Sequence, residues 1–161
     1  MSRRPDLTTR RGLLTAGGAG ALTMALGAAA ADQAPQTRTE AANARLVADF
    51  CAAWSGPALD PEQLFAQYFS EDCIVRVMDS QMLTTGRVAT VAMFRGWLES
   101  GRHFELKILR NLALGPLVIN LRTDTAFAPG RPAVAATIVS AFVIRGGKIR
   151  EWSDYRVPDG A

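Results

Sequence analysis

Apolar residues in the first half of the chain recur at the spacing of amphipathic helices. From Ala44 they lie three or four positions apart, and Ser55-Gly56-Pro57 ends this pattern. Asp60-Pro61-Glu62-Gln63 predicts the start of a second helix, with an N-cap, a first-turn proline and a Gln that reaches back. A third helical pattern follows Gly86. The apolar positions of these three predicted helices are Leu46, Val47, Phe50, Cys51, Trp54, Leu64, Phe65, Tyr68, Phe69, Val88, Val91, Phe94, Trp97 and Leu98.

The second half of the chain changes to the alternation that is typical of strands. Glycine-containing turns at 115–116, 129–130 and 146–147 separate the strand-like segments. The predicted strands are His103–Ala113, Leu117–Phe127, Ala133–Arg145 and Lys148–Val157, and Cys73–Met78 is also rich in β-forming residues. This order predicts an α+β fold, in which three N-terminal helices pack on a strongly curved, mostly antiparallel sheet.

The N-terminal segment has the composition of an export signal. Residues 12–31 consist of Gly, Ala, Leu, Met and Thr, and no acidic residue lies between Asp6 and Asp32. The pair Arg10-Arg11 resembles the bacterial twin-arginine signal, which implies export to the periplasm. We therefore expect a signal at 1–31 that is cleaved after Ala31, a tether at 32–42 and a domain at 43–161. The alternative is an uncleaved membrane anchor, although Gly and Ala favour insertion less than Leu does.

Charge and residue counts exclude several classes of function. The chain carries 18 Lys and Arg against 15 Asp and Glu. Because residues 1–31 hold four of the basic residues and one acidic residue, 14 of each remain in the rest of the chain. This balance argues against a nucleic-acid partner. A single His and two cysteines at unrelated spacing argue against a zinc or haem site. Cys51 and Cys73 are expected to be buried small hydrophobic residues, with a disulfide as the alternative.

Two predicted strands carry polar residues that could form a catalytic site. Asn120, Arg122 and Asp124 project to the same side of the strand 117–127, because their spacing is two. Asp154 lies near the end of the last strand, so two aspartates could flank one arginine. The alternative is a solvated strand face with a surface ion pair.

The predicted C-terminal hairpin has the sequence Phe142-Val143-Ile144-Arg145-Gly146-Gly147-Lys148-Ile149-Arg150-Glu151-Trp152-Ser153-Asp154-Tyr155. This segment resembles the closing hairpin of the limonene-1,2-epoxide hydrolase family. The family's Arg-x-Asp is matched by Arg122 and Asp124, and Tyr68-Phe69-Ser70-Glu71-Asp72 and Gly86-Arg87 are compatible with it. The resemblance implies the cone-shaped fold with a central pocket that nuclear transport factor 2, SnoaL-like cyclases and ketosteroid isomerase share. It also implies a homodimer, a small apolar substrate and no cofactor or metal.

The same resemblance implies roles for three residues. Asp154 would be the base that deprotonates water, Asp124 the acid that protonates the epoxide oxygen, and Arg122 the bridge between them. Two carboxyl groups in an apolar pocket cannot both ionise cheaply, so one retains a proton while the arginine favours ionisation of the other. The implied function is cofactor-independent hydrolysis of a small lipophilic epoxide.

The sequence departs from the family at the residues that hold the attacking water. The family has a Tyr and an Asn where this chain has Val75 and Val77. Neither valine can bind water, so another group must orient it or hydrolysis is not the reaction. The candidate substitutes are Asp79, Tyr68 and Asn111, and Trp152 is expected in the pocket wall, where it could position the substrate.

Two other functions remain open. An isomerase or cyclase would need a base other than Val77, such as Asp79 or the aspartate pair. A binding module could have kept the charged residues of the pocket without turnover. His103 could serve a SnoaL-like reaction, but beside Arg102 and Glu105 it is expected at the surface.

Overall fold

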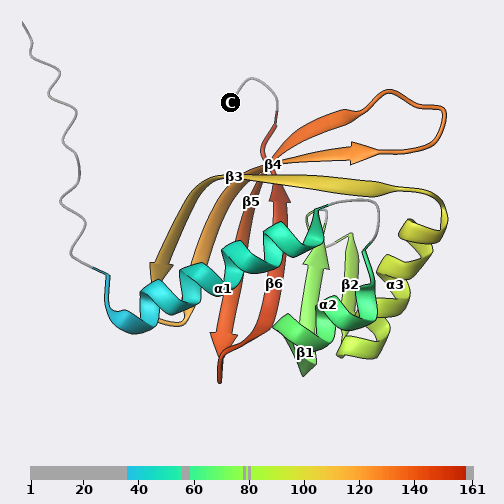
Figure 1. Ribbon diagram of the computed structural model, residues 1–161. Helices are drawn as coiled ribbons and strands as arrows, with labels where there is room; N and C mark the ends of the chain where they lie inside the picture. Colours follow the sequence, from blue (N-terminus) through green and yellow to red (C-terminus); the bar gives the residue numbers. More distant parts are fainter. Residues whose placement is uncertain (1–35, 56–58, 78, 80, 159–161) are drawn as a thin grey trace, which may run out of the picture. The chain divides into compact units, whose positions relative to one another are not determined.

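A computed structural model describes residues 36–55, 59–77, 79 and 81–158 (Figure 1). The elements, in chain order, are α1 (Arg38–Trp54), α2 (Pro61–Tyr68), β1 (Phe69–Val77), β2 (Met82–Thr85), α3 (Arg87–Glu99), β3 (His103–Leu114), β4 (Leu117–Phe127), β5 (Val134–Arg145) and β6 (Lys148–Arg156). The predicted α+β class with three helices is confirmed. The predicted signal at 1–31 lies outside the described residues.

Helix α1 begins earlier than its apolar pattern predicts. Thr37 is the N-cap, and it forms a capping box with Glu40, whose side chain accepts a hydrogen bond from the Thr37 backbone N–H at 2.8 Å. Residues 38–42, which we expected in the tether, therefore form the first turns of this helix. Within the described ranges, none of the helices combines the length and the apolar character that crossing a membrane would require.

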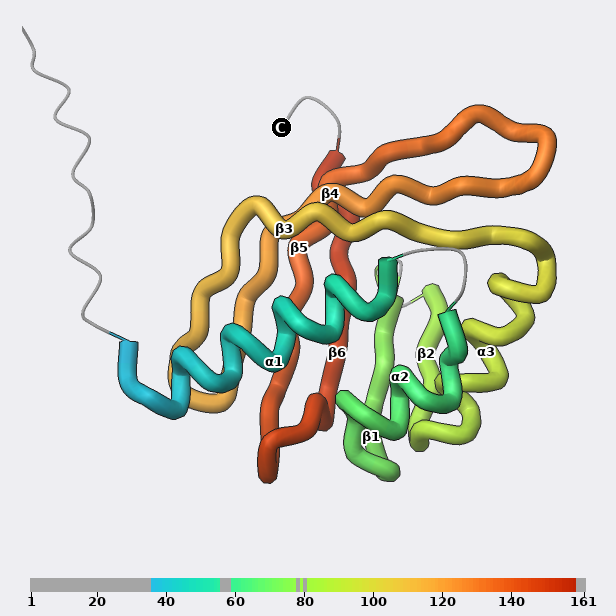
Figure 2. Tube along the Cα trace, viewed as in Figure 1, coloured from blue at the N-terminus to red at the C-terminus, as the bar shows by residue number. Residues whose placement is uncertain are grey.

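Six strands form one curved sheet, in the order β2-β1-β6-β5-β4-β3 (Figure 1). The predicted antiparallel meander is its β3-β4-β5-β6 part, because each of these strands pairs with the next. The sheet is larger than predicted, since β1 pairs with β6 in parallel and β2 pairs with β1. Helix α1 lies across one face of the sheet, while α2 and α3 lie towards β1 and β2 (Figures 1 and 2).

Aromatic side chains fill the space between the helices and the sheet. Phe50 of α1 is fully buried, and its ring lies 5.0 Å from Phe69 and 5.4 Å from Trp152, measured between centroids. Trp54, one turn later, lies 4.6 Å from Phe94 of α3. Edge-to-face contacts at such distances stabilise a core beyond the burial of area alone. This cluster fixes α1 and α3 relative to β6, which carries one of the predicted catalytic residues.

Two β-bulges change which side chains face the helices. In β6, Ile149 pairs with Ile144 and Glu151 with Val143, so Arg150 is an extra residue. In β3, Leu109 is extra in the same way, between Ile108 and Arg110. The bulge at Arg150 has a direct consequence for the site, because Trp152 and Asp154 then face the helix-covered side.

Candidate active site

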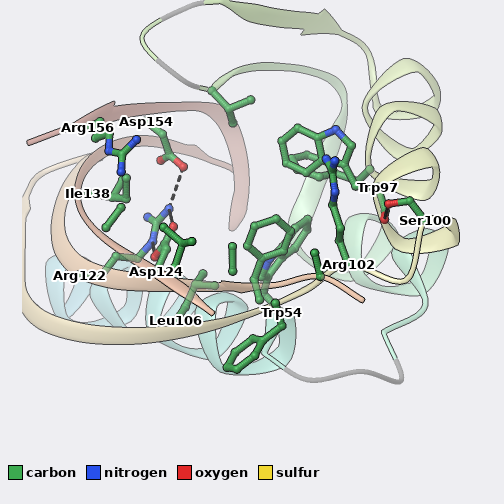
Figure 3. A pocket seen from close by; sticks show the side chains of 18 of the residues that line it. Trp54, Trp97, Ser100, Arg102, Leu106, Arg122, Asp124, Ile138, Asp154 and Arg156 are labelled. Atoms are coloured by element: carbon green, nitrogen blue, oxygen red, sulfur yellow. Dashed lines mark hydrogen bonds and ion pairs between the residues drawn. The ribbon is translucent and has the colours of Figure 1, made fainter. Parts of the chain in front are cut away.

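Residues of the sheet and of the helices line a cavity of about 890 Å³ that is open to solvent (Figure 3). Aromatic and aliphatic side chains make most of its wall, which is typical of a site for a small apolar molecule. The residues that line it include Trp54, Val77, Met82, Phe94, Trp97, Phe104, Leu106, Phe127, Val134, Ile138 and Trp152. The wall of this cavity also contains the three predicted catalytic residues, which are Arg122, Asp124 and Asp154.

Arg122 of β4 is almost completely buried, with 1% of its side chain exposed. Its Nε donates to Oδ1 of Asp124 at 2.6 Å, and its Nη2 donates to Oδ2 of the same residue at 3.0 Å. The spacing of two along β4 puts both side chains on one face, and the two hydrogen bonds make the pair bidentate. The alternative of a solvated surface ion pair is therefore wrong.

Nη2 of Arg122 also donates to Oδ2 of Asp154 at 2.7 Å (Figure 3). Asp154 comes from β6, two strands away from β4 in the sheet. The guanidinium therefore bridges the carboxylates of two separate strands, as the sequence predicted. The side chain of Asp154 is 11% exposed and that of Asp124 is 20% exposed, so both carboxylates keep limited access to the cavity.

Ser140 of β5 is a site residue that the sequence analysis missed. Its Oγ accepts a hydrogen bond from Nη1 of Arg122 and donates one to Oδ1 of Asp154 at 2.5 Å. Since an arginine can only donate, these two bonds orient the serine proton towards Asp154. The sequence does place Ser140 in the strand between β4 and β6. Only the cross-strand register, however, shows that its side chain lies beside Arg122 and Asp154.

Trp152 also donates its indole N–H to Oδ1 of Asp154. The Asp154 carboxylate thus accepts from Arg122, Ser140 and Trp152, a set of donors suited to an ionised carboxylate. A carboxylate offers about four accepting positions, and two of these bonds use Oδ1. Among the described residues, the remaining acceptor position is on Oδ2.

Burial and charge set the protonation of this cluster. Burial raises the pKa of Asp124 above its ordinary value, Arg122 opposes this shift, and the negative charge of Asp154 adds to it. For Arg122, burial would lower the pKa, but Asp154 and Asp124 outweigh it and raise the pKa. Asp124 therefore binds a proton more readily than an exposed aspartate does.

The two valines at the family's water-holding positions have different environments. Val75 is fully buried in the core, and Val77 lines the cavity. The described part of the chain brings none of the three expected substitutes into the cavity wall. The Asp79 carboxylate accepts from the Arg156 backbone N–H at 3.3 Å, Tyr68 is buried in the core, and Asn111 donates to the Ala44 carbonyl at 2.8 Å.

The remaining candidates for chemistry lie outside this cluster. His103 is partly buried, and its ring stacks on Phe127 at 4.6 Å. Both cysteines are buried and free, as expected, and burial raises the pKa of the Cys51 thiol to about 12. Among the described residues, no three His, Cys, Asp or Glu side chains are grouped closely enough to hold a metal ion.

Comparison with solved structures shows the fold. An LEH-like epoxide hydrolase of *M. tuberculosis* is 23% identical, with a TM-score of 0.64, over 73% of this chain and 84% of that chain. A protein described as a SnoaL-like polyketide cyclase from *Jannaschia* sp. CCS1 is 17% identical, with a TM-score of 0.64, over 76% and 90%. A hypothetical protein with a ketosteroid isomerase-like fold from *Catenulispora acidiphila* is 20% identical, with a TM-score of 0.58, over 68% and 83%.

Comparison with family models shows the family of the chain, whereas the solved structures show only its fold. A search of curated proteins found no match. The model of the limonene-1,2-epoxide hydrolase catalytic domain matches residues 41–157, which include every residue of the site described above. The chain therefore belongs to the limonene-1,2-epoxide hydrolase family, within the nuclear-transport-factor-2-like superfamily.

Proposed function

We propose that this protein hydrolyses a small lipophilic epoxide to a vicinal diol without a cofactor. Family membership supports an epoxide hydrolase-like, small-molecule-binding fold. The observation that carries the finer proposal is the bridge from Arg122 to Asp124 and Asp154 in the wall of an apolar cavity. This arrangement supplies one acid and one base within reach of the same bound substrate.

The reaction adds water across one C–O bond of the epoxide. Asp154 removes a proton from water, and the water oxygen forms a bond to a ring carbon. The C–O bond of that carbon breaks, and its electron pair goes to the epoxide oxygen, which takes a proton from Asp124. Ring strain favours this opening, and each positioned proton transfer contributes about 10²- to 10⁴-fold in rate. Proton exchange with solvent then restores a protonated Asp124 and an ionised Asp154.

The hydrogen bonds support this assignment of acid and base. Asp154 accepts from three donors and keeps one acceptor position, on Oδ2, for a water molecule. Asp124 has a raised pKa, which suits a proton donor. Arg122 binds both carboxyl groups. The proposed acid, Asp124, and the proposed base, Asp154, are therefore held close enough to act on the same substrate molecule.

The test is diol formation from a panel of epoxides in isotopically labelled water. We expect one labelled oxygen in each diol and a loss of at least about a thousandfold in kcat for Asp154→Asn. Asp49→Asn is the matched control, because Asp49 is exposed on α1, away from the cavity. A wild-type protein that is inert on the whole panel, or an Asp154→Asn variant that keeps its activity, would overturn the proposal.

A second candidate is a small-molecule-binding module without turnover. The observation in its favour is the replacement of the family's water-holding residues by Val75 and Val77. A module of this kind would show ligand-induced increases in melting temperature with no product. The labelled-water experiment separates the two, because only the enzyme transfers the label.

A further inference from the structure

The cavity contains more positive charge than the catalytic cluster uses. Its wall holds four arginines and two aspartates: Arg102, Arg122, Arg131, Arg156, Asp124 and Asp154. Arg122 binds both aspartates, so three arginines of the wall remain outside that cluster. Four arginines against two aspartates leave an excess of positive charge in a wall that is otherwise apolar, and such a cavity concentrates the electric field and attracts anions.

Arg102 and Arg131 belong to the same end of the cavity. Arg102 lies between α3 and β3, and Arg131 lies in the turn that joins β4 to β5. Figure 2 shows that the start of β3 and the tip of this hairpin lie on the same side of the molecule. The two segments touch, because a Cβ added to Gly101 would lie 2.7 Å from Cγ of Pro129.

This end lies away from the two carboxylates. In Figure 3, Arg102 lies beside Trp97 and Ser100, across the cavity from Asp154 and Arg122. His103 pairs with Phe127, so Arg102 is level with Ala128, which follows the end of β4 and lies four residues after Asp124. At roughly 3.3 Å per residue, the backbone at Arg102 is about 13 Å along the strand from the level of Asp124.

Neither arginine forms an ion pair with another described residue. Both are exposed at the rim, while the residues next to them in the wall, such as Phe104 and Phe127, are apolar and partly buried. Both guanidinium groups therefore lack an acidic partner among the described residues, and a bound anion would supply one. A guanidinium also matches the planar geometry of a carboxylate in a bidentate contact.

We infer that the substrate is an amphipathic epoxide with a carboxylate at the end away from the ring. The carboxylate binds Arg102 and Arg131 at the rim, the apolar body lies along the aromatic wall, and the epoxide reaches Asp124 and Asp154. This inference rests on the proposed function for the position of the ring, but the anion site stands on the two arginines alone.

Arg156 does not serve the same purpose. It lies on β6 two residues after Asp154, at the catalytic end of the cavity (Figure 3). An anion bound there would lie close to the negative charges of Asp124 and Asp154, which would repel it. The rim arginines have no such acidic neighbours in the cavity wall.

Binding of unreactive probes tests the anion site separately from catalysis. Straight-chain saturated carboxylates of increasing length are compared by calorimetry with the primary alcohols of the same chain length. We expect the carboxylates to bind at least about tenfold more tightly at low ionic strength, with the difference reduced by salt. Equal affinity for acid and alcohol would overturn the inference.

Two single variants and a control locate the site. Arg102→Gln and Arg131→Gln are each expected to weaken carboxylate binding roughly tenfold and to leave alcohol binding unchanged. Arg145→Gln is the matched control. Arg145 is exposed at the β5–β6 turn, so this substitution removes the same charge at a position outside the cavity. Equal effects of all three variants would indicate general charge rather than a site, and would contradict the inference.

Kinetics with epoxides that have or lack a terminal carboxylate then test the proposed function and the anion site together. We expect the acid to have a KM at least about tenfold lower than its neutral ester, and Arg102→Gln to remove this difference with little change in kcat. If carboxylates bind through the two arginines but no epoxide is hydrolysed, the proposed function fails and the anion site survives. If neutral epoxides are hydrolysed as well as the acids, the anion site fails and the proposed function survives.

Discussion

Ser140 Oγ donates a 2.5 Å hydrogen bond to Oδ1 of Asp154, its direct cross-strand partner in β5 and β6. The same hydroxyl accepts from Arg122, so it links the cation and the carboxylate by a second route beside their direct contact. The proposed base is therefore held on both oxygens. Its freedom to rotate towards or away from the substrate depends on this serine.

Replacing Ser140 with Ala is expected to reduce both activity and stability. The change leaves one donor of Arg122 and one position on Asp154 without their buried partner, which costs about 1–3 kcal/mol. We expect a matching loss in the free energy of unfolding, measured by urea denaturation, and a fall in kcat of roughly tenfold or more. Ser153→Ala is the control, because Ser153 makes no hydrogen bond to a described side chain through its hydroxyl.

The titration of Asp124 is expected to depend on Asp154. Burial raises the pKa of Asp124 above 3.8, and Asp154 adds to the shift while Arg122 opposes it. Activity that needs protonated Asp124 is present below this raised pKa and is lost as the pH rises through it. Because the folded-state pKa exceeds the unfolded one, the contribution of Asp124 to stability also falls as the pH rises between the two values.

Carboxyl-carbon NMR of isotopically labelled protein measures this titration directly. In Asp154→Asn one negative charge is gone, so the Asp124 midpoint is expected to move to lower pH. A midpoint that stays where it is in the wild type would show that the two carboxyl groups are not coupled.

Introducing an amide at Val77 is expected to raise the rate of hydrolysis. Val77 lines the cavity and stands where the family has its water-holding Asn. An amide at this position could orient the attacking water, and better orientation is expected to raise kcat roughly tenfold in Val77→Asn. Val77→Ala is the matched control, since it shortens the side chain without adding a polar group. A Val77→Asn variant no faster than Val77→Ala would contradict the role given to this position.

Neither cysteine is expected to react in the folded protein. Cys51 and Cys73 are buried and free, and burial raises the pKa of both thiols. Because the thiolate is the reactive form, iodoacetamide at neutral pH should label neither residue in the native state and both after unfolding. Mass spectrometry of the two samples checks this. Labelling of the native protein at the rate of a free thiol would show that the core opens locally.

The position of the proposed catalytic cluster could be predicted because it depends on alternation. Arg122 and Asp124 share a face of β4 whatever the rest of the chain does, and this spacing is visible in the sequence. Asp154 could be placed on the last strand from the strand-like pattern of 148–157, and the family resemblance implied its role. Their contact through one guanidinium confirms that prediction.

Ser140 and the start of α1 could not be predicted by the same means. Counting back from the pair of Arg145 and Lys148 places Ser140 opposite Ser153, and the bulge moves its partner to Asp154. The start of α1 is determined by the polar capping box of Thr37 and Glu40, which lies before the apolar pattern begins. Cross-strand register determines the partner of Ser140, and local polar contacts determine where α1 begins. Neither produces a periodicity of apolar residues that could be recognised in the sequence.

The bulge at Arg150 makes the orientation of the site residues on β6 insensitive to a deletion at this one position. The cross-strand partners on both sides of the bulge are already those of a regular ladder with Arg150 left out. Deleting this residue would therefore keep Trp152 and Asp154 facing inward, whereas deleting one residue between Trp152 and Asp154 would turn the base outward. The strand can therefore lose a residue at this one point without any change in which side chains face the cavity.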